Sequence, residues 1–137
     1  MNPKKVIVIT GPEECGKTFI SNNISLAFEN PLFISGRCIK TDDPFLFQDV
    51  EEDTDLIILD DVKPENVSTL VFMCYGYIYI EKRFEKQKKI KAPLVIINTT
   101  NFKPNIKGRS LDRRMKLVVI SKNIDLNNKP KISITSN

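Results

Sequence analysis

The residues 11–18, GPEECGKT, combine two glycines, a lysine and a threonine at a spacing suited to phosphate chemistry. Apolar residues 6–9 precede them and a helical pattern over 19–28 follows. A glycine-bounded loop between a strand and a helix turns backbone N–H groups toward a phosphate, and the helix N-terminus adds unpaired N–H groups. We therefore predict a phosphate loop in which Lys17 reaches the β- and γ-phosphates and Thr18 ligates Mg²⁺; an ordinary glycine turn is the alternative. The predicted nucleotide-binding residues are Gly11, Pro12, Glu13, Glu14, Cys15, Gly16, Lys17 and Thr18.

A second stretch, DLIILDD at residues 55–61, ends a continuous apolar run with two carboxylates. Such a run is typical of a central parallel strand that is covered on both faces. Because open α/β sheets bind ligands at the carboxyl ends of their strands, Asp60 is expected beside the phosphate loop. There it would hold Mg²⁺, and Asp61 would orient or deprotonate the attacking water. The alternative is a strand that ends in an acidic turn.

Polar residues also follow the apolar run at 94–97, in the order Asn98, Thr99, Thr100 and Asn101. An amide at the end of this strand would hold the attacking water against the γ-phosphate. Turn formation is the alternative, because asparagine favours turns.

Between these motifs, residues 77–80 and 88–91 are predicted to pair as a β-hairpin with a basic tip. The segment 81–91 has six basic residues and two acidic ones, which suits a polynucleotide backbone, and Phe84 offers a stacking face. The alternative is an exposed hairpin that lysine protects from aggregation.

The bulk composition limits the remaining choices. A chain of 137 residues is predicted to form one α/β domain, with residues 121–137 as an edge strand or a loose tail. The absence of histidine excludes histidine-based metal sites and nucleophile pairs. Three cysteines at unrelated spacings indicate free thiols in a reducing, intracellular compartment. The sequence contains no apolar run long enough to predict a membrane span.

The charges are unevenly distributed although the net charge is only +4. Residues 41–62 contain nine acidic residues and no basic one, whereas residues 103–116 are basic. This polarity indicates a nucleic-acid-binding face or head-to-tail packing of copies, in which the basic edge of one copy faces the acidic middle of the next. Solvated surface charge is the alternative for any single cluster.

Together, GPEECGKT (11–18), LIILDD (56–61), the segment 77–101 and SLDRRM (110–115) resemble superfamily 3 helicases of the AAA+ class. The resemblance is most specific to the helicase domain of Rep proteins of circular single-stranded DNA viruses and plasmids. It implies a three-layer P-loop fold with a mainly parallel five-stranded sheet, order 5-1-4-3-2, and a basic β-hairpin insertion. It also implies ATP and Mg²⁺ as cofactors, single-stranded DNA as partner, and a homo-oligomeric ring with a hexamer as the expected size.

The resemblance also implies roles for individual residues. The γ-phosphate sensor maps best to Asn101, with Asn98 as second choice. An arginine finger that reaches the neighbouring subunit's nucleotide maps to Arg113 or Arg114. The hairpin residues that grip DNA map to Lys86, Lys88 and Lys89, and less firmly to Lys82 and Arg83.

The chain departs from Rep proteins because it has no histidine pair for DNA nicking, so the nicking domain of that family is expected to be missing from it. The pattern is also shared by helicases of RNA viruses. A P-loop kinase or a nucleotide-gated assembly module without motor activity would also carry such a phosphate loop. A kinase would transfer phosphate to a small acceptor, and an assembly module would not need the hairpin lysines.

Overall fold

The computed structural model describes residues 4–13, 16–103, 109–124 and 130–135, so Glu14 and Cys15 of the predicted loop lie outside the described residues. The first half of the chain forms β1 (Val6–Gly11), α1 (Lys17–Ser25), β2 (Pro31–Ser35), β3 (Leu56–Val62) and α2 (Pro64–Cys74). The second half forms β4 (Tyr77–Ile80), β5 (Lys88–Lys91), β6 (Leu94–Thr100), α3 (Arg109–Arg114), β7 (Met115–Ile124) and β8 (Pro130–Thr135).

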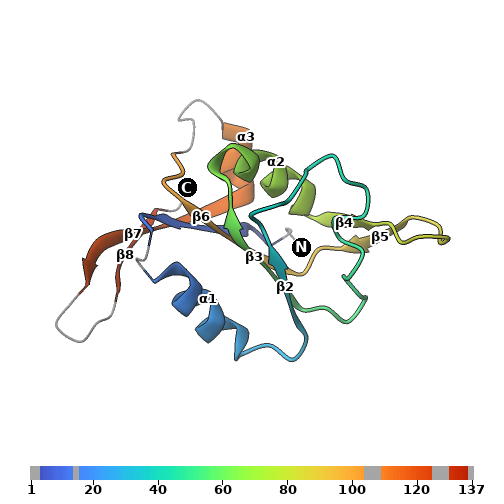
Figure 1. Ribbon diagram of the computed structural model, residues 1–137, viewed down its shortest axis with the longest axis horizontal. Coiled ribbons are helices and arrows are strands. Elements are labelled where there is room, and N and C mark those ends of the chain that lie inside the picture. The colour runs from blue at the N-terminus through green and yellow to red at the C-terminus, as the bar shows by residue number, and fades with distance from the viewer. Residues whose placement is uncertain (1–3, 14–15, 104–108, 125–129, 136–137) are drawn as a thin grey trace.

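Six strands form the main sheet in the order β2-β3-β6-β1-β7-β8. The first five run parallel, and β8 pairs antiparallel with β7 at one edge. Figure 1 shows α1 on one face of this sheet, with α2 and α3 on the other. The predicted α/β class with a mainly parallel sheet is therefore confirmed.

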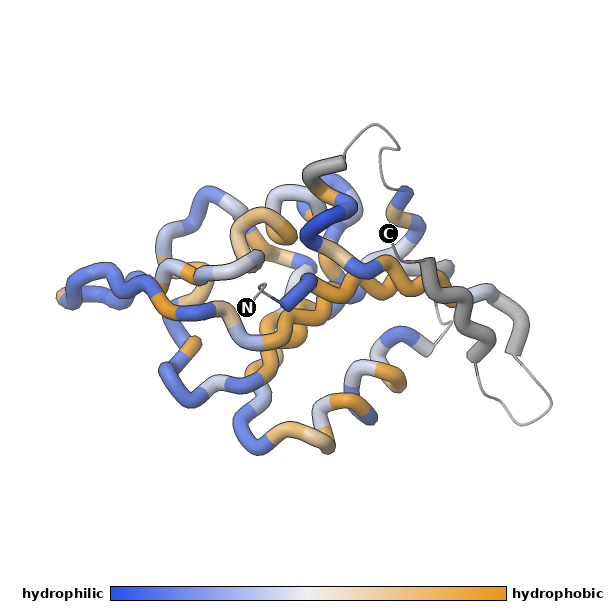
Figure 2. The backbone as a smooth tube through the Cα atoms, turned by 180° about the vertical axis from the view of Figure 1, so that it is seen from behind, coloured by the Kyte–Doolittle hydropathy of each residue, from blue (hydrophilic) through white to orange (hydrophobic). Residues whose placement is uncertain are grey.

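Two apolar clusters explain this layering, because alternate residues of a strand point to opposite faces. Ile57 and Leu59 of β3 pack in the cluster that includes Val67 and Leu70 of α2. Leu56 and Ile58 pack in the cluster on the α1 side. All four β3 residues are fully buried, as the continuous apolar run predicted, and Figure 2 shows the hydrophobic strands at the centre of the molecule.

The spacing of Val67, Leu70, Val71 and Cys74 along the sequence predicts a helix over residues 64–74. Helix α2 has this range and closes the larger cluster with Cys74 at its last turn. Burial raises the pKa of the Cys74 thiol to about 12, so this residue packs as a neutral apolar group. Helix α1 differs from the predicted range 19–28, since it begins at Lys17 and ends at Ser25. It can begin there because Gly16 adopts a positive φ of 98°, which glycine tolerates without strain.

The strands β4 and β5 form a separate two-stranded sheet that projects from the body of the protein (Figure 1). Their register pairs Tyr77 with Lys91 and Ile80 with Lys88. Figure 2 shows that the tip of this hairpin is largely hydrophilic. Phe84, in the turn between the two strands, is fully exposed. Among the described residues, none of the three helices has the length and apolar character needed to cross a membrane.

Candidate functional site

The carboxyl ends of β1, β3 and β6 meet beside the N-terminus of α1, because these three strands are parallel neighbours in the sheet. In register, Gly11 of β1 lies opposite Thr100 of β6. The backbone N–H of Asn101 donates to the Gly11 carbonyl at 3.1 Å, and that of Phe102 donates to Thr10 Oγ1 at 2.8 Å. The end of β6 is thus tied to the start of the predicted phosphate loop.

Lys17 lies at the first position of α1 and folds back over the loop. Its Nζ atom donates to the carbonyl of Pro12 at 2.8 Å and to that of Gly11 at 3.3 Å. The ammonium group therefore lies over the backbone of the loop, next to the N-terminus of α1. An anion at this position would be bound by the ammonium group and by the N–H groups of the helix N-terminus.

The two aspartates at the end of β3 point in different directions because the ladder between β3 and β6 is irregular there. Leu59 pairs with Ile97 and Val62 pairs with Thr99, so two residues of β3 oppose one residue of β6. Asp61 lies in this β-bulge and has a φ of 58°, a left-handed conformation that aspartate adopts more readily than most residues. Consecutive aspartates are thereby separated into two environments.

Asp60 faces the loop and α1. Its Oδ1 atom accepts from the Thr18 hydroxyl at 3.4 Å and from Asn98 Nδ2 at 3.1 Å. Thr18 and Asp60 are the two residues predicted to hold Mg²⁺, and the structure brings their oxygens together. Neighbouring ligands of an octahedral Mg²⁺ ion lie about 3 Å apart, so this oxygen pair suits the ion in both chemistry and spacing.

Asp61 lies at the surface, where its Oδ2 atom accepts from Arg37 Nε at 2.9 Å. The side chains of Arg37 and Asp61 are 78% and 50% exposed, so this ion pair contributes little to stability. The sequence analysis did not identify Arg37. Its position one residue after Gly36, at the end of β2, is the one signal that places it near the strand ends.

Asn98 is buried, and its amide group contacts two other residues of the site. Its Nδ2 atom donates to Ser21 Oγ at 2.7 Å as well as to Asp60, and the amide group has two hydrogens for these two bonds. Asn101 is exposed, with a φ of 55°. Both residues lie at the predicted strand end, Asn98 against Asp60 and Asn101 against the loop.

Ser21 is a further residue that sequence reasoning missed. It is buried one helical turn after Lys17, and its hydroxyl donates to the Lys17 carbonyl at 3.2 Å. Through Asn98 it links α1 to Asp60 of β3. A polar residue four positions after the motif lysine, on the helix face that must pack against the sheet, was the available signal.

Gly36 fixes the position of Asp60 from the other side, because its backbone N–H donates to the Asp60 carbonyl. A Cβ atom at Gly36 would lie 2.5 Å from Val62 Cγ2 and 2.6 Å from the Asp60 carbonyl oxygen. We expect Gly36→Ala to lower the free energy of unfolding by about 1–3 kcal/mol and to displace Asp60. Urea denaturation tests this, with Ser35→Ala at the exposed neighbouring position as control. Equal denaturation midpoints for the two variants would contradict the expected clash.

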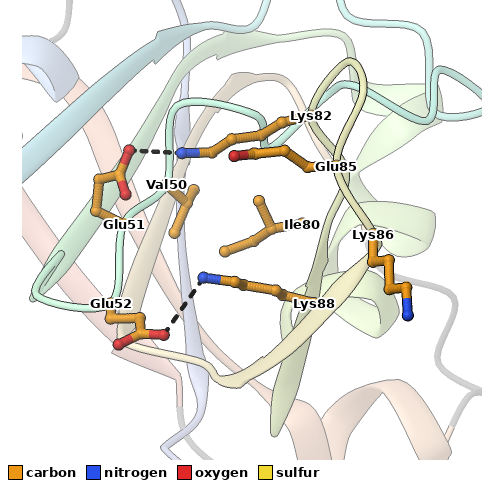
Figure 3. A pocket seen from close by; sticks show the side chains of 8 residues that line it. All are labelled: Val50, Glu51, Glu52, Ile80, Lys82, Glu85, Lys86 and Lys88. Carbon is orange, nitrogen blue, oxygen red and sulfur yellow. Dashed lines mark hydrogen bonds and ion pairs between the residues drawn. The ribbon is translucent and has the colours of Figure 1, made fainter.

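The hairpin lysines are divided between two faces. Lys82 and Lys88 bind Glu51 and Glu52 of the acidic segment, at 2.7 and 3.6 Å. Figure 3 shows these pairs flanking Ile80, while the amine of Lys86 points away. The hydrogen bond and charge of Lys82 lower the pKa of Glu51, and those of Glu51 raise the pKa of Lys82. At these residues the acidic and basic segments pair within one chain.

Lys89 lies on the other face, with its Nζ atom 4.4 Å from the centre of the Tyr77 ring. Arg83 and Lys86 are exposed near the tip. The predicted nucleic-acid-binding residues are therefore not equivalent: Lys88 has an acidic partner, Lys89 has an aromatic one and Lys86 extends toward solvent.

The two arginines of α3 lie far from the phosphate loop of their own chain. Met115, the next residue, pairs with Val6 at the start of β1, whereas the loop follows Gly11 at its end. A strand of this length spans about 17 Å at ~3.3 Å per residue. Arg113 is exposed, and the guanidinium of Arg114 lies 5.0 Å from the centre of the Phe72 ring.

No protein-family profile matches the chain, and no curated protein is similar to it in sequence. In contrast, 104 chains of known structure share its fold. One is JCV helicase with a bound thiazolopyridine derivative, with a TM-score of 0.65 and 18% identity over 88% of this chain. Two structures of the NrS-1 C-terminal region have TM-scores of 0.59 and 0.58, with 22% and 18% identity over 87% and 90% of this chain.

This chain spans only 36%, 29% and 30% of the lengths of those three chains. At such identities the similarity shows a shared fold. The described α/β domain therefore has the fold of a part of JCV helicase and of the NrS-1 C-terminal region.

Proposed function

We propose that this chain is the ATP-hydrolysing motor domain of a Rep-type replicative DNA helicase that acts on single-stranded DNA as an oligomeric ring. One observation carries the proposal: Thr18, Asp60 and Asn98 come from three separate elements and converge beside Lys17. A hydroxyl, a carboxylate and an amide next to a lysine-bearing loop form the donor set that binds Mg²⁺ and a triphosphate.

In this proposal the residues 11–18 wrap the phosphates of ATP, and the Lys17 ammonium neutralises charge on the β- and γ-phosphates. Thr18 and Asp60 hold Mg²⁺, which supplies neutralisation of the charge that develops on the transferred phosphoryl group. Asp61 leaves its exposed ion pair with Arg37 to orient or deprotonate the attacking water, and Asn101 senses the γ-phosphate. Asn98, held by Ser21, positions the Asp60 carboxylate.

The proposed motor also needs a polymer and a second copy. The basic hairpin, with Lys86, Lys88 and Lys89, binds the backbone of single-stranded DNA through its positive charge. Because Arg113 and Arg114 lie a full strand length from their own loop, either arginine reaches only the nucleotide of a neighbouring subunit. The fold shared with JCV helicase supports a motor on nucleic acid.

The metal site gives the first test. We expect Asp60→Asn to reduce Mg²⁺-dependent ATP hydrolysis by about a hundredfold or more, because it removes the charge that faces the ion and keeps the shape of the side chain. Phosphate release is measured with excess Mg²⁺, and with EDTA to confirm that the wild type needs the ion. Asp53→Asn, an equal change of charge at an exposed turn, is the control. A wild-type rate in Asp60→Asn would refute the assignment.

The polymer is tested in the same assay. Hydrolysis by the wild type is expected to rise with added single-stranded DNA and with protein concentration, because the polymer aligns neighbouring subunits. A rate per subunit that is unaffected by both would leave an ATPase without motor activity. Comparison of single-stranded DNA with single-stranded RNA identifies the preferred polymer.

A further inference from the structure

The outer face of the hairpin carries aromatic side chains that the apolar core does not require. Along β4, Ile78 and Ile80 are buried, whereas Tyr77 and Tyr79 are 53% and 54% exposed. Opposite residues of an antiparallel pair share a face, so Lys89 and Lys91 of β5 lie on the tyrosine face. Each tyrosine of β4 thus lies opposite a lysine of β5 on one face of the hairpin.

This face borders an aromatic hollow of about 400 Å³, lined chiefly by Phe72, Tyr75, Tyr77, Tyr79 and Lys89. The Phe72 ring at the end of α2 is 48% exposed. Every described residue that lines the hollow is aromatic, apolar or basic. Exposed rings in a lining that includes a lysine and no carboxylate suit a planar ligand that carries negative charge.

Two cations lie over these rings. Lys89 Nζ is 4.4 Å from the centre of the Tyr77 ring, and the Arg114 guanidinium is 5.0 and 5.3 Å from the centres of Phe72 and Tyr75. Rings that hold bases and cations that hold phosphates are the two components of a surface that binds single-stranded nucleic acid.

We infer that the aromatic hollow binds the unpaired bases of single-stranded nucleic acid by stacking on Tyr77 and Tyr79, while Lys89 contacts the adjacent phosphate. The inference rests on the proposed function for the choice of polymer, and it names the binding surface. It distinguishes Lys89 from its neighbour Lys88, which faces the acidic segment and is paired with Glu52.

The test measures binding of a short fluorescein-labelled oligothymidylate by anisotropy, without nucleotide. We expect Tyr77→Ala and Tyr79→Ala each to weaken binding about tenfold, whereas Tyr77→Phe and Tyr79→Phe keep the ring and bind as the wild type does. An abasic strand of the same length is expected to bind more weakly than oligothymidylate to the wild type, and equally to the wild type and the alanine variants.

Lys89→Ala and Lys40→Ala form a matched pair, with the same change of charge at two exposed lysines, of which Lys89 lines the hollow and Lys40 does not. We expect Lys89→Ala to weaken binding several-fold and Lys40→Ala to leave it within twofold, since Lys40 is an exposed lysine of the loop after β2 and does not line the hollow. Equal losses in both variants would show that overall charge, and not the aromatic face, governs binding, and would overturn the inference.

The inference and the proposed function can fail separately. Stacking on the tyrosines in a protein that does not hydrolyse ATP would support the inference and refute the motor. DNA-stimulated hydrolysis with unchanged binding by Tyr77→Ala and Tyr79→Ala would refute the inference alone. If the alanine variants change only the mass of the protein in sedimentation, the hollow is an interface between copies and the inference is wrong.

Discussion

Replacing Lys17 by alanine is expected to slow ATP hydrolysis by about a hundredfold or more while the protein stays folded. The ammonium group binds the loop carbonyls, at 2.8 Å from that of Pro12, so its loss removes the charge placed to meet the phosphates. The fold should persist because the Gly11 carbonyl keeps its hydrogen bond from the Asn101 N–H.

Phosphate release and thermal denaturation are measured on the same preparations of Lys17→Ala. Lys4→Ala is the matched control, because Lys4 is an exposed lysine just before β1, at the end of this strand opposite to the loop. A Lys17→Ala variant that hydrolyses ATP as fast as Lys4→Ala would show that residues 11–18 form an ordinary glycine turn.

The second large effect is expected at the arginines of α3. An arginine finger contributes about 10³–10⁵-fold to the rate of phosphoryl transfer, so Arg113→Ala or Arg114→Ala should lose most hydrolysis. Arg113 gives the cleaner test because it is exposed, whereas Arg114 also packs on Phe72 and its removal costs contacts within the chain. The rate of phosphate release and the unfolding midpoint together separate these two effects.

Mixing variants tests whether the arginine acts between copies. Lys17→Ala lacks a working loop and Arg113→Ala lacks the proposed finger, so each is expected to be inactive alone. In a mixed ring, an intact loop of one subunit meets an intact arginine of the next, and part of the activity should return. If Arg113→Ala and Arg114→Ala are each active alone, and mixing with Lys17→Ala restores no activity, neither arginine is the finger.

Several elements could be predicted from the sequence because they depend on neighbours in the chain. The apolar run before Asp60 predicted the central strand β3, and the spacing of Val67, Leu70 and Val71 predicted α2. The alternation of Tyr77 to Ile80 predicted β4, and its pairing with β5 followed from the basic segment between them. Glycine at position 16 predicted the turn into α1, since its φ of 98° disfavours other residues.

The arrangement around Asp60 could not be predicted in the same way. The resemblance assigned the γ-phosphate sensor to Asn101 before Asn98, and nothing in the sequence predicted that Asn98 contacts Asp60 and Ser21. That contact depends on two residues of β3 opposing one of β6, and such a bulge is set by how strands far apart in sequence pack. The role of Gly36 likewise appears only when β2 lies against Asp60 and Val62.

By itself, the sequence determined the elements and the chemistry at their ends: a glycine-bounded loop with a lysine, carboxylates after one buried strand and amides after another. These features arise from backbone preferences and hydrophobic periodicity, which act over a few residues. Only the tertiary structure decided which oxygens meet at the loop, which hairpin lysines pair with Glu51 and Glu52, and which face the tyrosines. Those outcomes depend on strand register and on contacts between segments distant in sequence, which no local pattern encodes.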